Sequence, residues 1–367
     1  MTALCVTGPA NSLTDVRGLR AGHATLTGDG WLTGVTVVVT GPDGATGGVD
    51  VRGGGPGTRE TDLLGPLNQV ERVNAIVLAG GSAYGLSAAH GVMTRLGAMN
   101  RGFRMGPEPS HVVPIVPAAI LFDLGRGGDF GNYPGPPAGQ QAFDAALAAP
   151  EGDAVAAGCV GAGTGALAGQ LKGGTGSASE VLEQSGITVA ALAVVNAAGS
   201  VASERTGLLH GAPFGLPGEF DWLAAPSAAE LAAGAARLTG RPRTGPGTRA
   251  EPGAPRPLNT TIGVIGCDAS LTKAQCAKLA QVAHDGMARA IRPAHSMFDG
   301  DTIFALATGS GPPATPLELH AILASAADCF TRAVVHGVLS ASSATTPAGS
   351  WPSYLDLFPS VGARAGG

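Results

Sequence analysis

The sequence is poor in charged and aromatic residues, and both shortages exclude classes of function. Charged residues make up 13% of the 367 positions and aromatic residues 4%, whereas hydrophobic residues reach 44%. Such a balance is not that of a disordered chain, which has few apolar and many charged residues. The formal net charge is −5, and no basic patch is interleaved with aromatic rings. We therefore expect no nucleic-acid partner.

Cysteine is also scarce, because only five are scattered along the chain and no CxxC pair occurs. Their number and spacing indicate neither a zinc site nor a disulfide framework. The chain does not begin with the charged start and apolar stretch of an export signal, and no segment offers about 18 uninterrupted apolar residues. We expect a cytoplasmic protein with no membrane segment, no cofactor and no metal.

Glycine, by contrast, is abundant, with 59 residues, more than twice the usual share of about 7%. This abundance predicts many tight turns and close backbone approaches. Between the glycine clusters, short apolar runs predict strands and longer periodic segments predict helices. The strands are expected at residues 35–40, 75–79, 113–122, 155–160 and 188–195, and the helices at 86–96, 140–148 and 228–238.

The C-terminal part alternates strands with helices whose starts carry capping boxes. The strands are expected at residues 262–267 and 301–308, and the helices run from Thr272 with Gln275 to about 291 and from Thr315 with Glu318 to about 339. This alternation predicts an α/β fold of layered sheets and helices.

A junction separates these two parts of the chain. Residues 239–258 are rich in Pro, Gly and Arg and almost lack large apolar side chains, which predicts a flexible linker. The linker ends at Asn259-Thr260. A threonine at a new N-terminus carries its own base, because an α-amine titrates near pH 7.7–8. Cleavage before Thr260 would therefore create a nucleophile. Alternatively, Thr260 and Thr261 simply begin a strand, where threonine is favoured.

Two carboxylates follow in the segment HSMFDGD. Asp299 and Asp301 are two residues apart, so in extended chain both side chains point to one face. Paired carboxylates can hold a hydroxyl and an amine and share a proton. A turn or a metal site are the alternatives, although no further Asp, Glu or His has matching spacing. His295, close before the pair, is a candidate pocket residue.

Lysine is rare enough for each position to carry information. Lys172 lies between two glycine-rich runs, whereas Lys273 and Lys278 lie on a helix expected to be exposed. Lys172 could place positive charge near an oxyanion or favour a free amine, or it could be a solvated loop residue. Asn196 ends a predicted strand and could donate its amide N–H to an oxyanion, although Asn is also common where strands end.

Two competing motifs are weaker. Residues 161–166 fit the dinucleotide pattern GxGxxA after the expected strand 155–160, which would indicate an NAD(P)-binding oxidoreductase. However, no second strand ends in an acid about twenty residues later, so the ribose partner is missing. Ser82 lies in GGSAYG, which lacks the second glycine of a serine-hydrolase elbow.

Several spaced motifs together resemble the P1 peptidases, which include DmpA-type L-aminopeptidase/D-esterases, β-peptidyl aminopeptidases and NylC-type nylon-oligomer hydrolases. The resemblance extends from about Thr14 to Ala307. Its carriers are LAGGSAYGL (78–86), VPAAILFDLG (116–125), GAGTG with KGGTGSAS (161–179), AVVN (193–196), LNTTIGV (258–264) and HSMFDGDTIFAL (295–306).

This resemblance implies a four-layer αββα sandwich similar to N-terminal nucleophile hydrolases but with a different strand connectivity. It also implies self-cleavage into an α chain (1–259) and a β chain (260–367). The two chains would stay together as one domain and assemble into a homo-oligomer, expected to be a tetramer of αβ units. By position, Thr260 would be the nucleophile, Asp299 and Asp301 would orient it, and Lys172 and Asn196 would assist catalysis and hold the oxyanion.

The implied substrate is a small peptide or an amide oligomer such as that of 6-aminohexanoate, cleaved through an acyl-enzyme. A DmpA-type aminopeptidase is the alternative, and a paralogue that cuts itself without turning over substrate is another. The threonine nucleophile resembles the NylC-type members, but they carry a tyrosine where this chain has Phe122. Phe122 and Tyr84 are candidate pocket residues.

Overall fold

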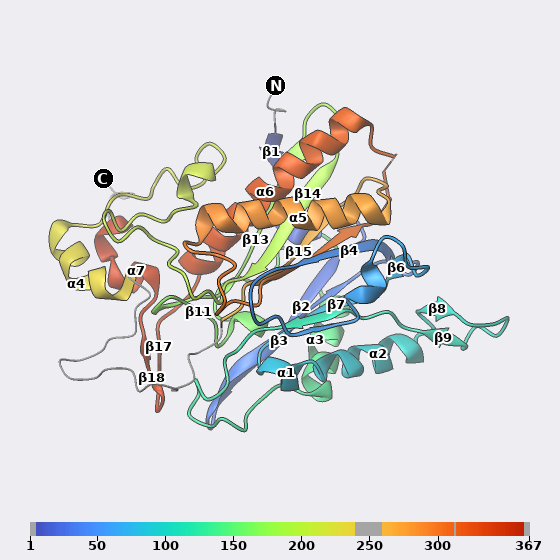
Figure 1. Ribbon diagram of the computed structural model, residues 1–367, viewed down its shortest axis with the longest axis horizontal. Helices are drawn as coiled ribbons and strands as arrows, with labels where there is room; N and C mark the ends of the chain where they lie inside the picture. The colour runs from blue at the N-terminus through green and yellow to red at the C-terminus, as the bar shows by residue number, and fades with distance from the viewer. Residues whose placement is uncertain (1–4, 239–258, 312, 363–367) are drawn as a thin grey trace.

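Two β-sheets lie face to face between two layers of helices (Figure 1). The structure is a computed structural model that describes residues 5–238, 259–311 and 313–362. The linker expected at 239–258 lies outside the described residues. The four layers agree with the expected αββα sandwich.

The larger sheet has seven strands, all antiparallel to their neighbours except for the parallel pair at its centre. In spatial order the strands are β1 (Cys5–Thr7), β13 (Thr175–Leu182), β14 (Thr188–Val194), β15 (Ile262–Cys267), β16 (Thr302–Ala307), β4 (Ala45–Val51) and β6 (Arg72–Val73). The outer face of this sheet is covered by α5 (Lys273–Ala290) and α6 (Pro316–Leu339) (Figure 1). The helix α5 makes the crossover that a parallel pair requires.

The smaller sheet has five strands. They are, in spatial order, β2 (Arg20–Gly28), β3 (Trp31–Val39), β7 (Ala75–Ala79), β10 (Ala118–Ile120) and β5 (Thr58–Arg59). Its outer face carries α2 (Ala88–Ala98) and α3 (Pro136–Ala148). Helix and sheet approach closely at Gly22 on β2, where a Cβ atom would stand 2.2 Å from the backbone nitrogen of Ala146.

Each interface between layers has its own apolar core. The core between the two sheets includes Ile76 from the smaller sheet and Leu192, Val264 and Phe304 from the larger one, all fully buried. Two sheets that bury one face against each other and the other against helices need apolar residues on both faces of their strands. The wholly buried strands β14, β15 and β16 satisfy that need.

The remaining elements are short or peripheral. They are α1 (Ser82–Gly85), α4 (Ala228–Leu238), α7 (Tyr354–Leu357), β8 (Phe103–Arg104), β9 (Val112–Val113), β11 (Leu167–Ala168), β12 (Leu171–Lys172), β17 (Ala344–Thr346) and β18 (Gly349–Trp351), with 3₁₀ turns η1 (Leu13–Asp15), η2 (Asp62–Leu64), η3 (Gly161–Gly163), η4 (Ala212–Phe214) and η5 (Pro359–Val361).

Most expected elements are confirmed, including both capping boxes, at Thr272 and Thr315. Two expected strands are wrong. In the segment 113–122 only Val113 and Ala118–Ile120 are strand, because Pro114 and Pro117 interrupt it and proline cannot donate to a ladder. Residues 155–160 form no strand and lead instead into η3.

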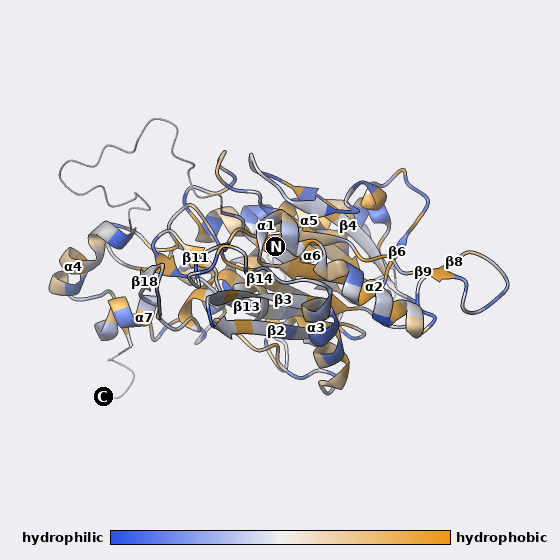
Figure 2. Ribbon diagram, turned by 90° about the horizontal axis from the view of Figure 1, so that it is seen from below, coloured by the Kyte–Doolittle hydropathy of each residue, from blue (hydrophilic) through white to orange (hydrophobic). Residues whose placement is uncertain are grey.

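The helix α6 is long and apolar enough to cross a membrane by length and composition alone. However, 72% of its most apolar window is buried inside the protein, as in the core helix of a globular fold. Figure 2 shows α6, β13 and β14 in the middle of the molecule, with α4 and the β8–β9 hairpin at opposite ends.

Candidate active site

The site is built around Thr260, which lies two residues before β15 begins at Ile262 and is 2% exposed. Its backbone N–H donates to the Asn196 carbonyl oxygen at 2.6 Å, and its hydroxyl Oγ1 donates to the Asn259 carbonyl oxygen, also at 2.6 Å. The hydroxyl therefore lies against the carbonyl group of the peptide bond that is predicted to break.

The carbonyl of Asn259 receives a second hydrogen bond. The backbone N–H of Gly300 donates to its oxygen at 3.1 Å, and the Asn259 N–H in turn donates to the Phe298 carbonyl at 2.8 Å. Asn259 and Asp299 thus form an isolated parallel bridge. Donors aimed at a carbonyl oxygen stabilise the negative charge that it gains when a nucleophile adds to its carbon.

The two carboxylates hold neighbouring backbone segments in place around this bond. Asp299 accepts from the Ala198 N–H at 3.0 Å and from the N–H and hydroxyl of Ser296, while Asp301 accepts from the Thr261 N–H at 2.7 Å. Both carboxylates are almost completely buried. Burial, and secondly the charge of Asp301, raises the pKa of Asp299. A carboxylate with a raised pKa accepts a proton more readily at neutral pH.

The aromatic neighbours expected near this site are only partly brought together. His295 donates its backbone N–H to Asp301, and its ring Nδ1 lies 2.8 Å from the same carboxylate. Phe122 contributes its carbonyl, which accepts from the Asn196 side chain at 3.3 Å. Tyr84 is 58% exposed and stacks on Tyr133, and no hydrogen bond links it to Thr260 in the described part of the chain.

Asn196 lies at the centre of the site, but its contacts differ from those expected. Its carbonyl holds the Thr260 N–H, and its side-chain Oδ1 accepts from the Leu167 N–H at 3.0 Å and from Arg126 at 2.6 Å. Its amide Nδ2 points to Phe122, so the donor on the Asn259 carbonyl is Gly300 instead. A role for Asn196 in holding the oxyanion stays a prediction.

Sequence reasoning missed Arg126. Its guanidinium donates to the Gly165 carbonyl at 2.7 Å, to Asn196 Oδ1, and to the side-chain oxygen of Asn259 at 3.2 Å. Burial lowers the pKa of Arg126 to about 10, which leaves it charged at neutral pH. The signal that could have found it is a lone arginine directly after the buried motif VPAAILFDLG, since an unpaired buried cation needs acceptors.

Lys172 is fully buried, so its reading as a solvated loop residue is wrong. Its ammonium donates to three backbone carbonyls, of Thr164 (3.1 Å), Ala166 (2.7 Å) and Gly173 (3.3 Å). Burial lowers its pKa from 10.5 to about 8. Within the described residues it makes no hydrogen bond with Thr260. It shapes the loop between η3 and β13, which in turn contacts Asn196 and Arg126.

The expected exposure of Lys273 is also wrong. Lys273 is 6% exposed, and its ammonium donates to the carbonyls of Leu63 (3.1 Å), Asn68 (2.8 Å) and Val70 (2.8 Å). Its place at the first turn of α5 predicted exposure, but the loop around η2 closes over it.

The structure around residues 161–166 does not have the elements of a dinucleotide-binding motif. No strand precedes the run, and η3 is a single 3₁₀ turn rather than the helix whose N-terminus would bind a pyrophosphate. A Cβ atom on Gly161 would meet Thr36 Oγ1 at 2.3 Å, and one on Gly163 would meet the Thr175 nitrogen at 2.4 Å. These glycines serve close packing inside the protein.

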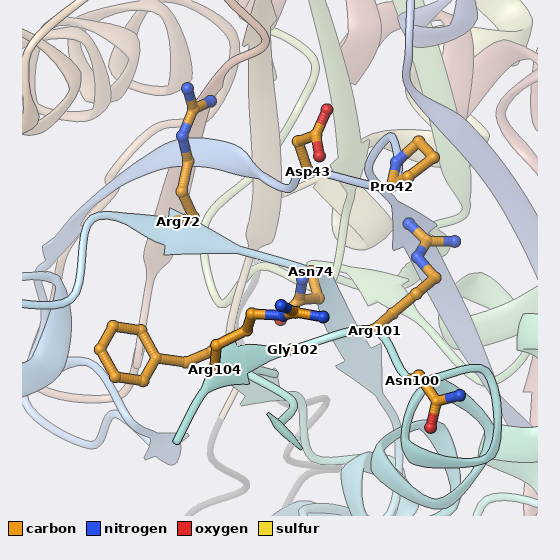
Figure 3. A pocket seen from close by; sticks show the side chains of 9 residues that line it. Pro42, Asp43, Arg72, Asn74, Asn100, Arg101, Gly102 and Arg104 are labelled. Carbon is orange, nitrogen blue, oxygen red and sulfur yellow. The ribbon is translucent and has the colours of Figure 1, made fainter. Parts of the chain in front are cut away.

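A separate pocket of about 330 Å³ is lined by three arginines and two asparagines (Figure 3). Its lining residues are Pro42, Asp43, Arg72, Asn74, Asn100, Arg101, Gly102, Phe103 and Arg104. None of them belongs to the site around Thr260. Thr40, Arg72 and Asn74 lie at the ends of β3, β6 and β7 that are farthest from that site.

Sequence comparison shows which family and which relatives this chain resembles. The sequence model of peptidase family S58 matches residues 11–351. An uncharacterized aminopeptidase of Mycobacterium tuberculosis (strain ATCC 25618 / H37Rv) is 51% identical, over 95% of this chain and 98% of the relative. A 6-aminohexanoate-oligomer endohydrolase of Kocuria sp. (strain KY2) is 29% identical, over 77% of this chain and 72% of the relative.

Solved structures give the same fold. A Burkholderia sp. beta-aminopeptidase superposes with a TM-score of 0.69 at 22% identity, covering 99% of this chain and 98% of that one. The L-aminopeptidase D-Ala-esterase/amidase of Ochrobactrum anthropi gives 0.66 at 20% identity, covering 95% and 92%. The latter is described as a variant of the N-terminal nucleophile hydrolase fold, which confirms the expected fold class.

Proposed function

The chain belongs to peptidase family S58, and we propose that it cuts itself between Asn259 and Thr260 and then uses Thr260 as its nucleophile. Its family and its relatives make it an amide-bond hydrolase. Self-cleavage, the nucleophile and the substrate are the parts that we propose.

One observation carries the proposal. The Thr260 hydroxyl lies 2.6 Å from the oxygen of the adjacent Asn259 carbonyl, and the Gly300 N–H donates to the same oxygen. A nucleophile, its target carbonyl and a donor for the developing negative charge therefore stand together in a buried site, where electrostatic stabilisation is strongest.

The first reaction is an N-to-O acyl shift. Oγ1 of Thr260 adds to the Asn259 carbonyl carbon, and negative charge forms on the carbonyl oxygen beside the Gly300 N–H. The hydroxyl proton is transferred to the Thr260 nitrogen as the C–N bond breaks, so that the amine leaves in neutral form. Water then hydrolyses the ester, which releases the Asn259 carboxylate and restores the Thr260 hydroxyl.

The free α-amine of Thr260 then serves as the base in later cycles. The Asn196 carbonyl, which already accepts from the Thr260 nitrogen, is suited to hold that amine in place. An amide substrate would acylate Oγ1 and release its amine, and water would hydrolyse the acyl-enzyme.

The arrangement of the strands supports the proposal that the two chains stay together after cleavage. β15 and β16 belong to the β chain, and they pair with β14 and β4 of the α chain on either side. Separating the chains would break the centre of the larger sheet and expose two apolar cores.

We propose small peptides or 6-aminohexanoate oligomers as the substrates, and a DmpA-type aminopeptidase as the second candidate. The endohydrolase relatives favour the first class, and the aminopeptidase names of other relatives and structural neighbours favour the second. A screen of the processed protein against aminoacyl p-nitroanilides, β-peptides and 6-aminohexanoate oligomers separates these classes.

Two neighbouring threonines provide a matched test of self-cleavage. Thr260→Ala is expected to remain a single chain in denaturing gels and by intact mass, and to be inactive. Thr261→Ala, which removes a buried hydroxyl one residue later, is expected to yield chains of residues 1–259 and 260–367. A wild-type protein that stays uncut after long incubation, or an active Thr260→Ala protein, would contradict the proposal.

A further inference from the structure

Arg126 is a buried cation that forms no ion pair in the part of the chain that the structure describes. Its three hydrogen-bond acceptors, on Gly165, Asn196 and Asn259, are all neutral oxygens. The charge of Asp123 acts on Arg126, but in the described residues Asp123 forms no ion pair with it, and one of its carboxylate oxygens accepts from the Gly81 N–H at 2.6 Å. A buried guanidinium favours acceptors that carry more negative charge.

The acceptor from Asn259 is the informative one of the three. Asn259 supplies the acyl half of the bond that Thr260 faces, and its side chain points to Arg126 while its carbonyl faces Thr260 and Gly300. In the uncut chain, Arg126 therefore contacts the side chain of the residue on the acyl side of the scissile bond.

Asn259 must leave this position before another amide can reach Thr260. An external substrate has to bring its carbonyl to the same hydroxyl, which places its acyl-side group where the Asn259 side chain lay. The Nη2 group of Arg126 then loses the acceptor that it has among the described residues, and an oxygen of the substrate can replace it.

We propose that Arg126 determines acyl-side specificity, favouring an acyl residue with an oxygen acceptor at this position and disfavouring a free ammonium group there. The inference rests on the proposed function, because it assumes that Thr260 attacks both its own bond and the substrate. Arg126 then favours blocked or internal amides whose acyl residue carries a carboxamide or carboxylate, and it disfavours substrates that begin with a free amine.

The surrounding charges support this choice. An enzyme that removes N-terminal residues has to bind an ammonium group beside the scissile carbonyl, and a guanidinium repels it. The two carboxylates of the site are already engaged with donors, Asp299 with Ala198 and Ser296 and Asp301 with Thr261 and His295. A substrate ammonium would have to displace those donors.

The substrate test compares three p-nitroanilides on the processed protein: N-acetyl-asparaginyl, N-acetyl-leucyl and free leucyl. We expect kcat/KM to be highest for the N-acetyl-asparaginyl substrate, lower for N-acetyl-leucyl and lowest for free leucyl. The first should exceed the second by about tenfold or more, which is the value of a hydrogen bond to a charged group. In Arg126→Met this preference is expected to disappear, whereas Arg126→Lys, which keeps the charge, retains part of it.

A second test reads the same contact inside the precursor, and does not depend on finding a good substrate. Asn259→Leu is expected to slow self-cleavage by about tenfold in an otherwise wild-type chain. Combined with Arg126→Met it should add little, because the contact is already lost. Arg101→Met is the matched control, since Arg101 donates to the Thr40 and Gly41 carbonyls at the distant pocket, and there Asn259→Leu should keep its full effect.

The outcomes separate the two proposals. Equal rates on the two acetylated substrates, a fastest rate on free leucyl p-nitroanilide, or fully additive effects of Arg126→Met and Asn259→Leu would overturn the assignment of Arg126. Cleavage that persists in Thr260→Ala would instead overturn the proposed function.

Discussion

The two ends of the larger sheet are equipped with similar residues, although only one end holds the candidate nucleophile. At the Thr260 end, Lys172 donates to three backbone carbonyls, and Asn196 accepts from a backbone N–H. At the other end, about 20 Å away along β15, Lys273 also donates to three carbonyls, and Asn74 accepts from the Ile115 N–H at 2.9 Å.

The two ends differ in what is contacted by the loop whose carbonyls bind the buried lysine. The loop held by Lys172 reaches Asn196 and Arg126, and through them Thr260 and Asn259. The loop held by Lys273 closes the start of α5, next to the pocket lined by Arg72 and Asn74 (Figure 3). A buried lysine among carbonyls is therefore no mark of catalysis by itself, and its influence depends on what its loop positions.

The largest expected effect breaks the symmetry between the two lysines. Lys172→Met should slow self-cleavage and turnover by about 100-fold or more, because a displaced loop misplaces the groups around Thr260. Lys273→Met should leave both rates within about threefold. Gel time courses of the precursor and p-nitroanilide hydrolysis measure the two effects. Equal losses of both rates in the two variants would show that each lysine affects the reaction only by stabilising the fold.

Stability, in contrast, should respond alike at both ends. Each methionine variant leaves three buried carbonyls without their donor, so each should lower the free energy of unfolding by about 1–3 kcal/mol. The measurement is urea unfolding in the uncut Thr260→Ala background, where a single chain unfolds. A loss of stability in only one variant would mean that, in the other variant, water donates to the three carbonyls in place of the lysine.

The asparagines provide a smaller contrast. Asn196→Ala removes the acceptor for Leu167 and Arg126, so self-cleavage should slow by about tenfold, while Asn74→Ala should change it little. The ratio of the two rates, from the same gel assay, also tests the oxyanion role. A loss of about 100-fold or more in Asn196→Ala would favour direct contact with the developing charge.

The smallest expected effect is a pH dependence of stability. Burial lowers the pKa of Lys172 to about 8, so between pH 8 and about 10.5 the unfolded chain binds a proton that the folded chain has released. The free energy of unfolding, relative to Lys172→Met, should therefore rise over this window, by about 1 kcal/mol for the first pH unit above 8. Urea titrations at pH 7.5, 9 and 10 check the slope, and a flat difference contradicts it.

Local signals predicted the helices and several strands, for reasons that are visible in particular residues, but they gave no prediction for the strands β2, β4 and β13. Thr272 and Thr315 cap helices through contacts within one turn, and β15 and β16 are apolar because both of their faces are buried. The same reasoning failed at residues 113–122 and 155–160, where apolar composition predicted strands. In 113–122 two prolines break the run into short paired pieces, and in 155–160 Ala156 and Ala157 are exposed; apolar composition alone does not distinguish these cases from a continuous strand.

The candidate site divides in a similar way. Thr260 with Asn259, and Asp299 with Asp301, could be found from the sequence because each pair is adjacent or two residues apart. Arg126 could not be linked to Asn259, because 133 positions separate the two hydrogen-bonded residues. The donor role of Gly300 was equally hidden, since it belongs to a backbone N–H, which every residue type except proline carries.

The sequence by itself determined the capped helices, the strand β15 just after the Asn259–Thr260 junction and the short-range pairs around it, because these depend on neighbours within a few residues. Only the tertiary structure decided which buried groups serve Thr260. It brought Arg126, Asn196 and Gly300 to the Asn259–Thr260 bond. It also placed Lys172 and Lys273 at opposite ends of a sheet, where each donates to three backbone carbonyls. Hydrogen bonds between distant segments form only when the layers pack, so no local pattern records them.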